Sequence, residues 1–160
     1  MKLHPNWISG FVDGEGTFYI GINRQPSMTA GYQILPEFRV VQHKRDIKLL
    51  YALKDFFGCG VVRKNHDDRY ELRIRSLADL SQKVIPHFER YNLHTQKKFD
   101  FLKFKKIIRF MQEGKHLGPR GLLQIIEISQ QMNRKDKQSA HSVKKELFSR
   151  IRKSPPVIEK

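Results

Sequence analysis

The chain has 160 residues, 39% of them hydrophobic, and its 31 Lys and Arg against 16 Asp and Glu give a formal net charge of +15. This length suits one domain with a core of its own, and no stretch approaches the roughly 18 apolar residues of a membrane span. A single cysteine, Cys59, excludes a disulfide framework and a cysteine-rich zinc site. The charge favours a polyanionic partner. Because the basic residues are spread along the chain, nucleic acid is favoured over a membrane surface.

An unusual helix is predicted near the N-terminus, over residues 7–16. Pro5 suits a first turn, and apolar residues follow at helical spacing, at Trp7, Ile8, Phe11 and Val12. Gly10 and Gly14 each cost a helix interior about 1 kcal/mol relative to Ala. A helix that keeps both glycines on one face is typical of a backbone that lies close to another backbone.

Two acidic residues, Asp13 and Glu15, come at the end of this helix, and Gly16 is placed to terminate it. A carboxylate there faces the negative end of the helix dipole, at a cost of roughly 0.3–1 kcal/mol, so we expect a cation nearby. Mg²⁺ prefers one or two carboxylates together with substrate phosphate oxygens. A basic chain with this acidic pair is consistent with metal-dependent cleavage of phosphodiester bonds.

Two strand–strand–helix units follow the opening helix. The strands, recognised by alternation of apolar and polar residues, are predicted at residues 17–23, 32–42, 60–65 and 70–75. Helices are predicted at residues 46–58, 76–86, 97–110 and 122–132, with one more short helix around 143–151. Pro36 suggests an edge or a bulge, Asp46 and Ser76 suit N-caps, and Pro86 kinks or ends its helix. We expect one domain over residues 1–153 and a frayed basic tail over 154–160.

The polar faces of the predicted strands carry Asn, Gln and Arg, the side chains that make bidentate contacts with base edges. An ordinary half-buried sheet with a solvated face is the alternative, and the net charge favours the nucleic-acid interpretation. Two other groups of residues, the histidines and the lysines of the third quarter of the chain, are weaker candidates for a functional site. The seven histidines show no paired metal-ligand spacing, and the lysines between residues 97 and 109 suit a solvated helix face.

The segment Ile8-Ser9-Gly10-Phe11-Val12-Asp13-Gly14-Glu15-Gly16 resembles the LAGLIDADG motif of homing endonucleases. Further segments resemble the same family in the same order, at residues 38–42, 44–46, 57–60, 70–74, 95–101, 116–117, 121–122 and 132–133. The resemblance therefore covers roughly residues 7–133. It implies an α+β fold in the order αββαββα, with a saddle-shaped, four-stranded antiparallel sheet lying on DNA and extra C-terminal helices.

The resemblance also implies a metal site and a dimer. The motif acid, here Glu15 where the family more often has Asp, binds a catalytic divalent metal with the backbone carbonyl of Gly14. The metal is Mg²⁺ or Mn²⁺, with Ca²⁺ as a non-catalytic substitute. Only one motif copy is present, which implies a homodimer on a long, pseudo-palindromic DNA duplex, joined through the residues Ser9, Gly10, Asp13 and Gly14.

Supporting roles follow from the same resemblance. Gln42 matches a position that organises the attacking water, and Lys97 matches the neighbourhood of a basic residue at the phosphate; Thr95 and Lys98 remain alternatives for that slot. The residues predicted to read DNA bases are Asn23, Gln25, Gln33, Arg39, Arg63, Asn65, Arg73 and Arg75.

The predicted function is a site-specific, metal-dependent double-stranded DNA endonuclease. The alternatives within the same family are an intron RNA maturase, whose partner would be its own intron RNA, and a DNA-binding protein that does not cleave. The acid at position 15 favours cleavage. The N-terminus lacks the apolar core of a signal peptide, so we expect no targeting signal and no membrane partner. The resemblance implies a gene in a chloroplast or mitochondrion, or an intracellular microbial protein.

Overall fold

A computed structural model of the chain describes residues 1–133 and 138–153. The first half contains α1 (Pro5–Glu15), β1 (Gly16–Arg24), β2 (Tyr32–His43), a 3₁₀ turn (Lys44–Asp46), α2 (Ile47–Phe57), β3 (Val61–His66) and β4 (Arg69–Ile74). The second half contains α3 (Leu77–Asp79), a π-helical stretch (Leu80–Val84), α4 (Ile85–Arg90), α5 (Lys97–Gln112), a 3₁₀ turn (Lys115–Leu117), α6 (Pro119–Gln130) and α7 (Gln138–Lys153). This confirms the predicted αββαββα order with additional C-terminal helices.

The four strands form one antiparallel sheet in the order β1-β2-β4-β3. Strand β1 pairs along its whole length with residues 32–40 of β2, whereas β4 pairs only with the second half of β2, from Phe38 to His43. Pro36 lies opposite Ile20 of β1 and outside the stretch that pairs with β4. The edge position predicted for Pro36 is therefore confirmed, because on that side no neighbouring strand needs a backbone N–H.

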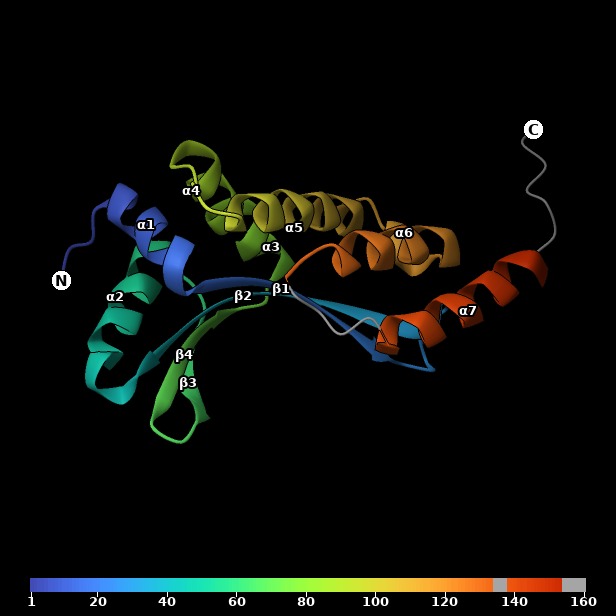
Figure 1. Cartoon of the computed structure of the whole chain (residues 1–160), viewed down its shortest axis with the longest axis horizontal. Coiled ribbons are helices and arrows are strands. Elements are labelled where there is room, and N and C mark those ends of the chain that lie inside the picture. The colour runs from blue at the N-terminus through green and yellow to red at the C-terminus, as the bar shows by residue number, and fades with distance from the viewer. Residues whose placement is uncertain (134–137, 154–160) are drawn as a thin grey trace.

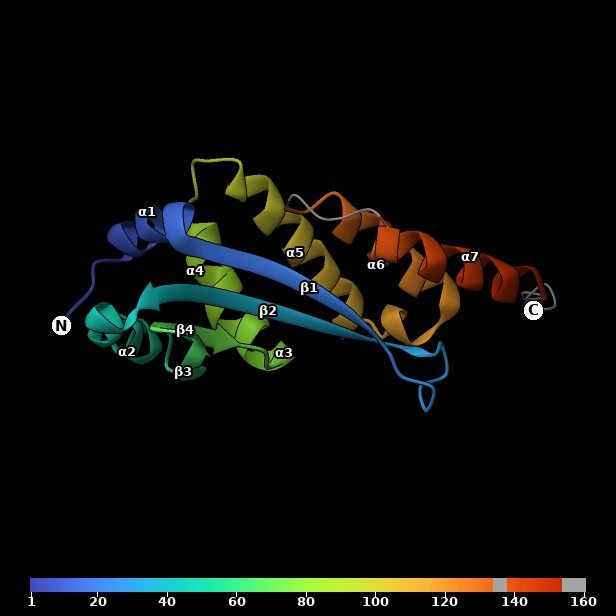
Figure 2. The same ribbon diagram turned by 60° about the horizontal axis from the view of Figure 1, so that its bottom comes forward.

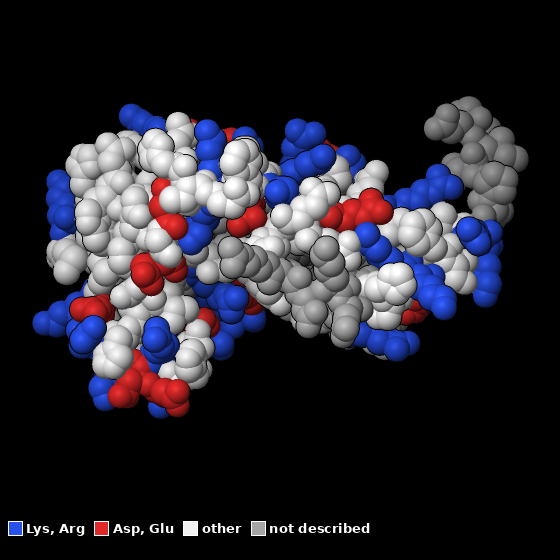
Figure 3. All heavy atoms as spheres, in the orientation of Figure 1, with Lys and Arg blue, Asp and Glu red and all other residues white. Residues whose placement is uncertain are grey.

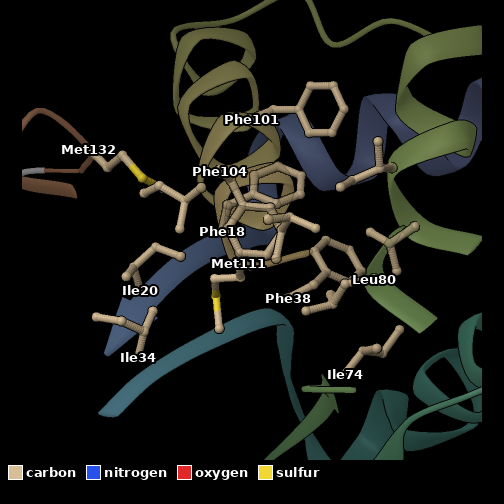
Figure 4. Packing of buried hydrophobic residues seen from close by; sticks show 14 of the residues in the cluster. Phe18, Ile20, Ile34, Phe38, Ile74, Leu80, Phe101, Phe104, Met111 and Met132 are labelled. Atoms are coloured by element: carbon tan, nitrogen blue, oxygen red, sulfur yellow. The ribbon is translucent and has the colours of Figure 1, made fainter. Parts of the chain in front are cut away.

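Helices α4, α5 and α6 lie along one face of the sheet (Figures 1 and 2). The core between them is built on Phe18 of β1, whose ring centroid lies 5.3 Å from those of Phe38, Phe101 and Phe104 (Figure 4). All four side chains are buried, and each contributes about 1.5–3 kcal/mol by leaving water. Alternation within the strands then directs their polar residues to the opposite face.

The ends of the helices follow the sequence with two differences. Gly58 ends α2 in a left-handed conformation with φ 62°, and the Ser76 Oγ accepts from the Asp79 N–H at 3.2 Å, as predicted. Asp46 precedes α2 but makes no capping bond with its side chain, because its φ of −105° and ψ of 17° are not the extended geometry of an N-cap. Pro86 does not end its helix. It lies in the first turn of α4, directly after the π-helical stretch, where its missing N–H is tolerated.

Helix α7 is longer than the short helix predicted around residues 143–151, because it runs from Gln138 to Lys153. Leu147 is fully buried, the Tyr32 hydroxyl donates to Glu146, and Arg150 donates to the carbonyl of Ala30 at 3.1 Å. These contacts tie α7 to the loop between β1 and β2. None of the helices in the described part of the chain is long and apolar enough to cross a membrane. The tail predicted over 154–160 lies outside the described residues.

His87 on α4 is buried beneath α1 and contacts the rings of Phe57, Phe88 and Tyr91. Its Nε2 lies 3.4 Å from the Ser9 Oγ. Burial lowers the pKa of His87 to about 4, because the surrounding rings do not solvate an imidazolium.

The neutral imidazole predicts a defined loss of stability in acid. In the unfolded chain His87 takes up a proton near its usual pKa of about 6.5, whereas the folded protein resists protonation down to about pH 4. The melting temperature should therefore fall as the pH falls through this window. The fall should be shallower in His87→Gln and unchanged in His141→Gln, which alters an exposed histidine. A slope in His87→Gln equal to that of the wild type would contradict the assignment.

Candidate active site and nucleic-acid face

Glu15 is the last residue of α1, and β1 begins at the next residue without a loop. The Gly16 N–H closes the helix by donating to the carbonyl of Val12. Gly16 also pairs with Val40 of β2, and this register brings the end of β2 alongside the end of α1. As a result, the Gln42 Nε2 donates to the Glu15 Oε2 at 3.2 Å, and the Glu15 carboxylate stays exposed to solvent.

Lys97 supplies the cation expected near this helix end. It is the first residue of α5 and is half-buried. Burial lowers the pKa of Lys97, and the negative charges of Asp13, Asp100 and Glu15 act in the opposite direction. The ammonium group therefore interacts with the acidic pair of α1. This interaction offsets the repulsion between those carboxylates and the negative end of the helix dipole.

The two alternatives to Lys97 are placed differently. The Thr95 hydroxyl donates to the Asp13 Oδ1 at 2.8 Å and accepts the Lys97 backbone N–H at 3.2 Å, so its hydrogen bonds fix the start of α5. Lys98 is exposed and lines a small groove with Phe88 and Phe101, away from the acidic pair. The negative charges of Asp13 and Glu15 act on Lys97, which supports Lys97 for the basic position.

Asp13 binds the loop before α5 in its own chain. Its carboxylate accepts the His94 N–H at 2.8 Å, the Thr95 N–H at 3.2 Å and the Thr95 hydroxyl. Burial pulls the pKa of Asp13 upward, but these hydrogen bonds and the nearby His94 outweigh it and hold the pKa below its usual range. Asp13 therefore has a structural role, as predicted, but its contacts lie within the chain.

Ser9 also differs from the prediction. Its side chain was expected on the face where two copies meet, yet it is 4% exposed, and its Oγ donates to the backbone carbonyl of Tyr91 at 2.7 Å. The reason is its place on the helix, one residue after the fully buried Ile8, so that it faces α4. Ser9 and Asp13 therefore both join α1 to the rest of their own chain.

The outer face of α1 is open. Gly10 and Gly14 are exposed, and an added Cβ at either position would meet nothing within 4 Å. Trp7 lies one turn before Gly10, is 45% exposed, and stacks on Phe11 at 4.9 Å. The surface over α1 carries few Lys or Arg, whereas these residues gather over α7 (Figure 3). Packing within the chain thus does not require a glycine at either position. The open stripe formed by Trp7, Gly10 and Gly14 on α1 has room for the backbone of another helix.

The donor groups at the end of α1 fit a hard divalent cation. The Glu15 carboxylate is exposed, and the Gly14 carbonyl belongs to the last helical turn, whose carbonyls have no partner within a helix. Oxygen donors of these types suit Mg²⁺, which completes its shell with water and phosphate. Within residues 1–133 and 138–153, no cluster of three or more His, Cys, Asp or Glu could hold a metal by itself.

The residues predicted to read bases fall in two groups on the open face of the sheet. Asn23 and Gln33 are cross-strand partners, and with Gln25 they lie exposed at the far end of the β1–β2 hairpin. The second group lies on the half of the sheet nearer to Glu15 and comprises Arg39, Arg63, Asn65, Arg73 and Arg75. Arg39 and Arg73 face one another across β2 and β4.

Two buried glutamates lie among this second group, and neither was predicted to be a functional residue. Glu37 is 4% exposed and pairs with Arg75 and, at 3.4 Å, with the Arg39 Nε. Glu71 is 2% exposed and accepts from the Arg63 Nε at 2.8 Å and the Asn65 Nδ2 at 3.0 Å. The alternation of the sequence predicts that both glutamates lie on the polar face. It does not predict their burial, because most of the side chains that pair with them come from other strands.

The contacts of Asp13 and Glu15 predict that replacing Asp13 lowers stability and that replacing Glu15 leaves it almost unchanged. Asp13→Asn should lower the free energy of unfolding by about 1–3 kcal/mol, because the amide cannot accept all the hydrogen bonds from residues 94 and 95. Glu15→Gln removes an exposed charge and should stay within about 0.5 kcal/mol of the wild type. Urea denaturation measures both variants. Equal stability of the two would contradict the structural role of Asp13.

Comparison with known proteins gives consistent results. The profile of the LAGLIDADG endonuclease family matches residues 8–108. The chain is 34% identical over 133 residues to probable intron-encoded endonuclease 2 of Neurospora crassa, covering 82% of this chain and 29% of that protein. It is 27% identical to the DNA endonuclease I-CeuI of Chlamydomonas moewusii, covering 83% of this chain and 64% of that protein. The chain thus spans less than two thirds of either relative.

Solved structures extend the similarity to the whole fold. The homing endonuclease I-TnaI has a TM-score of 0.88 and 54% identity, covering 92% of this chain and 99% of that chain. The LAGLIDADG homing endonuclease I-SmaMI bound to cleaved DNA has a TM-score of 0.87 and 30% identity, covering 99% of this chain and 52% of that chain. The motif on α1, the sheet and the helices behind it therefore have counterparts in a single family. The chain belongs to the LAGLIDADG endonuclease family.

Proposed function

We propose that the chain is a site-specific endonuclease that hydrolyses phosphodiester bonds of double-stranded DNA with a divalent metal. The observation that carries the proposal is the exposed Glu15 carboxylate, bonded by Gln42 and beside Lys97, at the edge of an open sheet face rich in arginine. The net charge of +15 supports a polyanionic substrate. The similar protein I-SmaMI has been solved bound to cleaved DNA.

The metal in this proposal is held by the Glu15 carboxylate and the Gly14 carbonyl. Mg²⁺ or Mn²⁺ bound there would polarise a phosphate oxygen and lower the pKa of a bound water. Ca²⁺ is the non-catalytic substitute, and I-SmaMI has been solved bound to uncleaved DNA in the presence of calcium ions. The donor chemistry supports this choice, because carboxylate and carbonyl oxygens suit Mg²⁺ better than the softer transition metals.

The residues around Glu15 have separate roles. Gln42 fixes one carboxylate oxygen of Glu15 through its amide N–H, and its own carbonyl oxygen is then available to orient a water. Lys97 brings a positive charge to the place where negative charge develops at the phosphate. Asp13 holds the loop at residues 94–95, from which α5 and Lys97 begin. Gln42 thus orients a water, Lys97 neutralises charge at the phosphate, and Asp13 positions Lys97.

We also propose that two copies of the chain form the functional unit. One chain brings one Glu15, and cutting both strands of a duplex needs two such groups. The open stripe of Trp7, Gly10 and Gly14 on α1 supports a two-fold contact between identical helices. Each copy would then cut one strand of a pseudo-palindromic site, and the sheets of the two copies would read its two halves.

The gene belongs, in this proposal, to an intron of an organellar genome. Two relatives carry names of this kind, an uncharacterized protein in ND4 intron 1 of Podospora anserina and an uncharacterized cox1 intron-2 protein of Schizosaccharomyces pombe. The RNA of its own intron is then a second partner, since a surface that neutralises DNA phosphates also suits RNA phosphates.

The catalytic assignment predicts that Glu15→Gln binds DNA but does not cut it. The amide keeps the shape of the side chain and its place beside Gln42, but it lacks the charge that holds a divalent metal. Wild type and variant should be incubated with a randomised duplex library and Mg²⁺, with binding read by gel shift and cleavage by sequencing of cut ends. Cleavage by Glu15→Gln at the wild-type rate would rule out Glu15 as the metal ligand.

The dimer predicts a selective effect of Gly10→Leu. Nothing within one chain blocks a side chain at this position, and replacing a helical glycine even adds helix propensity, so the single chain should keep its fold and its circular dichroism spectrum. Two α1 helices could no longer approach closely, and light scattering should report a monomer. Lys48→Leu, which adds the same side chain to the exposed face of α2, should stay dimeric. Monomeric wild type would contradict the two-copy proposal.

A further inference from the structure

We infer that Glu37 and Glu71 are specificity-determining residues, which hold the arginines of the open sheet face in fixed positions for base recognition. The inference rests on the proposed DNA-binding function. It concerns two acidic side chains on a surface meant for a polyanion, where a negative charge should weaken binding. Their presence therefore calls for a role other than affinity.

Both glutamates are almost completely removed from solvent, at 4% and 2% exposed. A buried carboxylate without partners is strongly unfavourable, and these two are buried by the side chains that pair with them. Glu37 is bound by Arg75 and Arg39, and Glu71 is bound by Arg63 and Asn65. Four of the eight residues predicted to read bases are thus attached to two carboxylates.

The register of the sheet explains why the contacts form across strands. Arg63 of β3 is the direct cross-strand partner of Glu71 on β4. Phe38 pairs with Ile74, so continuing this register by one residue sets Arg75 opposite Glu37 of β2. Each glutamate therefore binds at least one group from across a strand boundary, Glu37 binding Arg75 and Glu71 binding Arg63 and Asn65. These ion pairs restrict the arginine side chains to positions that the register of the sheet determines.

Arg73 completes the network. It lies on the same face of β4, between Glu71 and Arg75. Burial lowers the pKa of Arg73, the positive charges of Arg75 and Arg63 act in the same direction, and Glu37 and Glu71 oppose them. Without the two carboxylates, these arginines would repel one another and spread apart. The glutamates therefore keep several like charges close together at fixed spacing.

Holding the arginines in place improves the discrimination between correct and incorrect base pairs in three ways. A free arginine loses side-chain entropy when a contact orders it, and an arginine already held loses less on binding its correct base. A held arginine is also less able to turn toward a nearby phosphate when the base is wrong, so non-specific binding gains less. The two carboxylates moreover reduce the sequence-independent attraction of the face for phosphates.

The test compares base preferences in a randomised duplex library, selected by binding in the presence of Ca²⁺ and sequenced. Glu37→Gln and Glu71→Gln should each lose about tenfold in discrimination at the base pairs under the sheet, the range expected for one bidentate contact. They should also bind an unrelated duplex several-fold more tightly than the wild type. Glu89→Gln is the matched control, because it removes a carboxylate paired with Lys105 on the helical side of the molecule. This control should keep the wild-type preferences.

Charge-conserving variants separate position from charge and serve if the Gln variants fail to fold. Glu37→Asp and Glu71→Asp keep the net charge but withdraw the carboxylate by one methylene, so discrimination should fall while binding to unrelated duplex stays unchanged. Wild-type preferences in the folded Gln and Asp variants would overturn the inference and leave the proposed function intact. A wild type that selects no sequence from the library would overturn both.

Discussion

The direct passage from α1 into β1 is the constraint on which the site depends. Glu15 ends the helix and Gly16 starts the strand, so no loop separates the acidic group from the sheet. Gly16 is needed here for space, since a Cβ would lie 2.5 Å from the Val12 Cγ1. Its φ of −82° is one that any residue can adopt. The pairing of Gly16 with Val40 then sets Gln42 beside Glu15.

Helix α1, which ends at this junction, presents three different faces. Its inner face packs on the core through Ile8 and Val12, its Ser9 and Asp13 side chains bind α4 and the start of α5, and its outer face is open at Gly10 and Gly14. Glu15, the metal ligand that we propose, is the last residue of this helix. A change in the packing of α1 would therefore move the acid relative to both the sheet and any second copy.

The order of the elements and the face of each strand could be predicted from the sequence, because they depend on local periodicity. Phe18, Ile20 and Phe38 are buried, and Asn23 and Gln33 are exposed on the other face, as the alternation predicts. Glu15 stood out because an acid at a helix end is locally unfavourable. The predictions for Ser9, Pro86 and the length of α7 were wrong or incomplete. Ser9 is buried by a contact with Tyr91, which is distant in sequence, whereas Pro86 follows a π-helical stretch that the periodicity of the sequence does not reveal.

The candidate site divides in the same way. Motif similarity placed Glu15 and Gln42, but only the fold distinguishes Lys97, which interacts with the acids, from Thr95, which holds Asp13. The two buried glutamates are the clearest example of information absent from the sequence. Alternation puts Glu37 and Glu71 on the polar face, yet Arg75, Arg63 and Asn65 reach them from outside their own strands, and strand register is not encoded in any single segment.

In the proposed dimer, each copy of α1 brings one Glu15 to one strand of the duplex. The sharpest measurement uses a mixed dimer of wild type and Glu15→Gln, purified through two different tags and incubated with Mg²⁺ and a duplex that the wild type cuts. The mixed dimer should nick one strand and leave the other intact. Cleavage of both strands, or of neither, would contradict it.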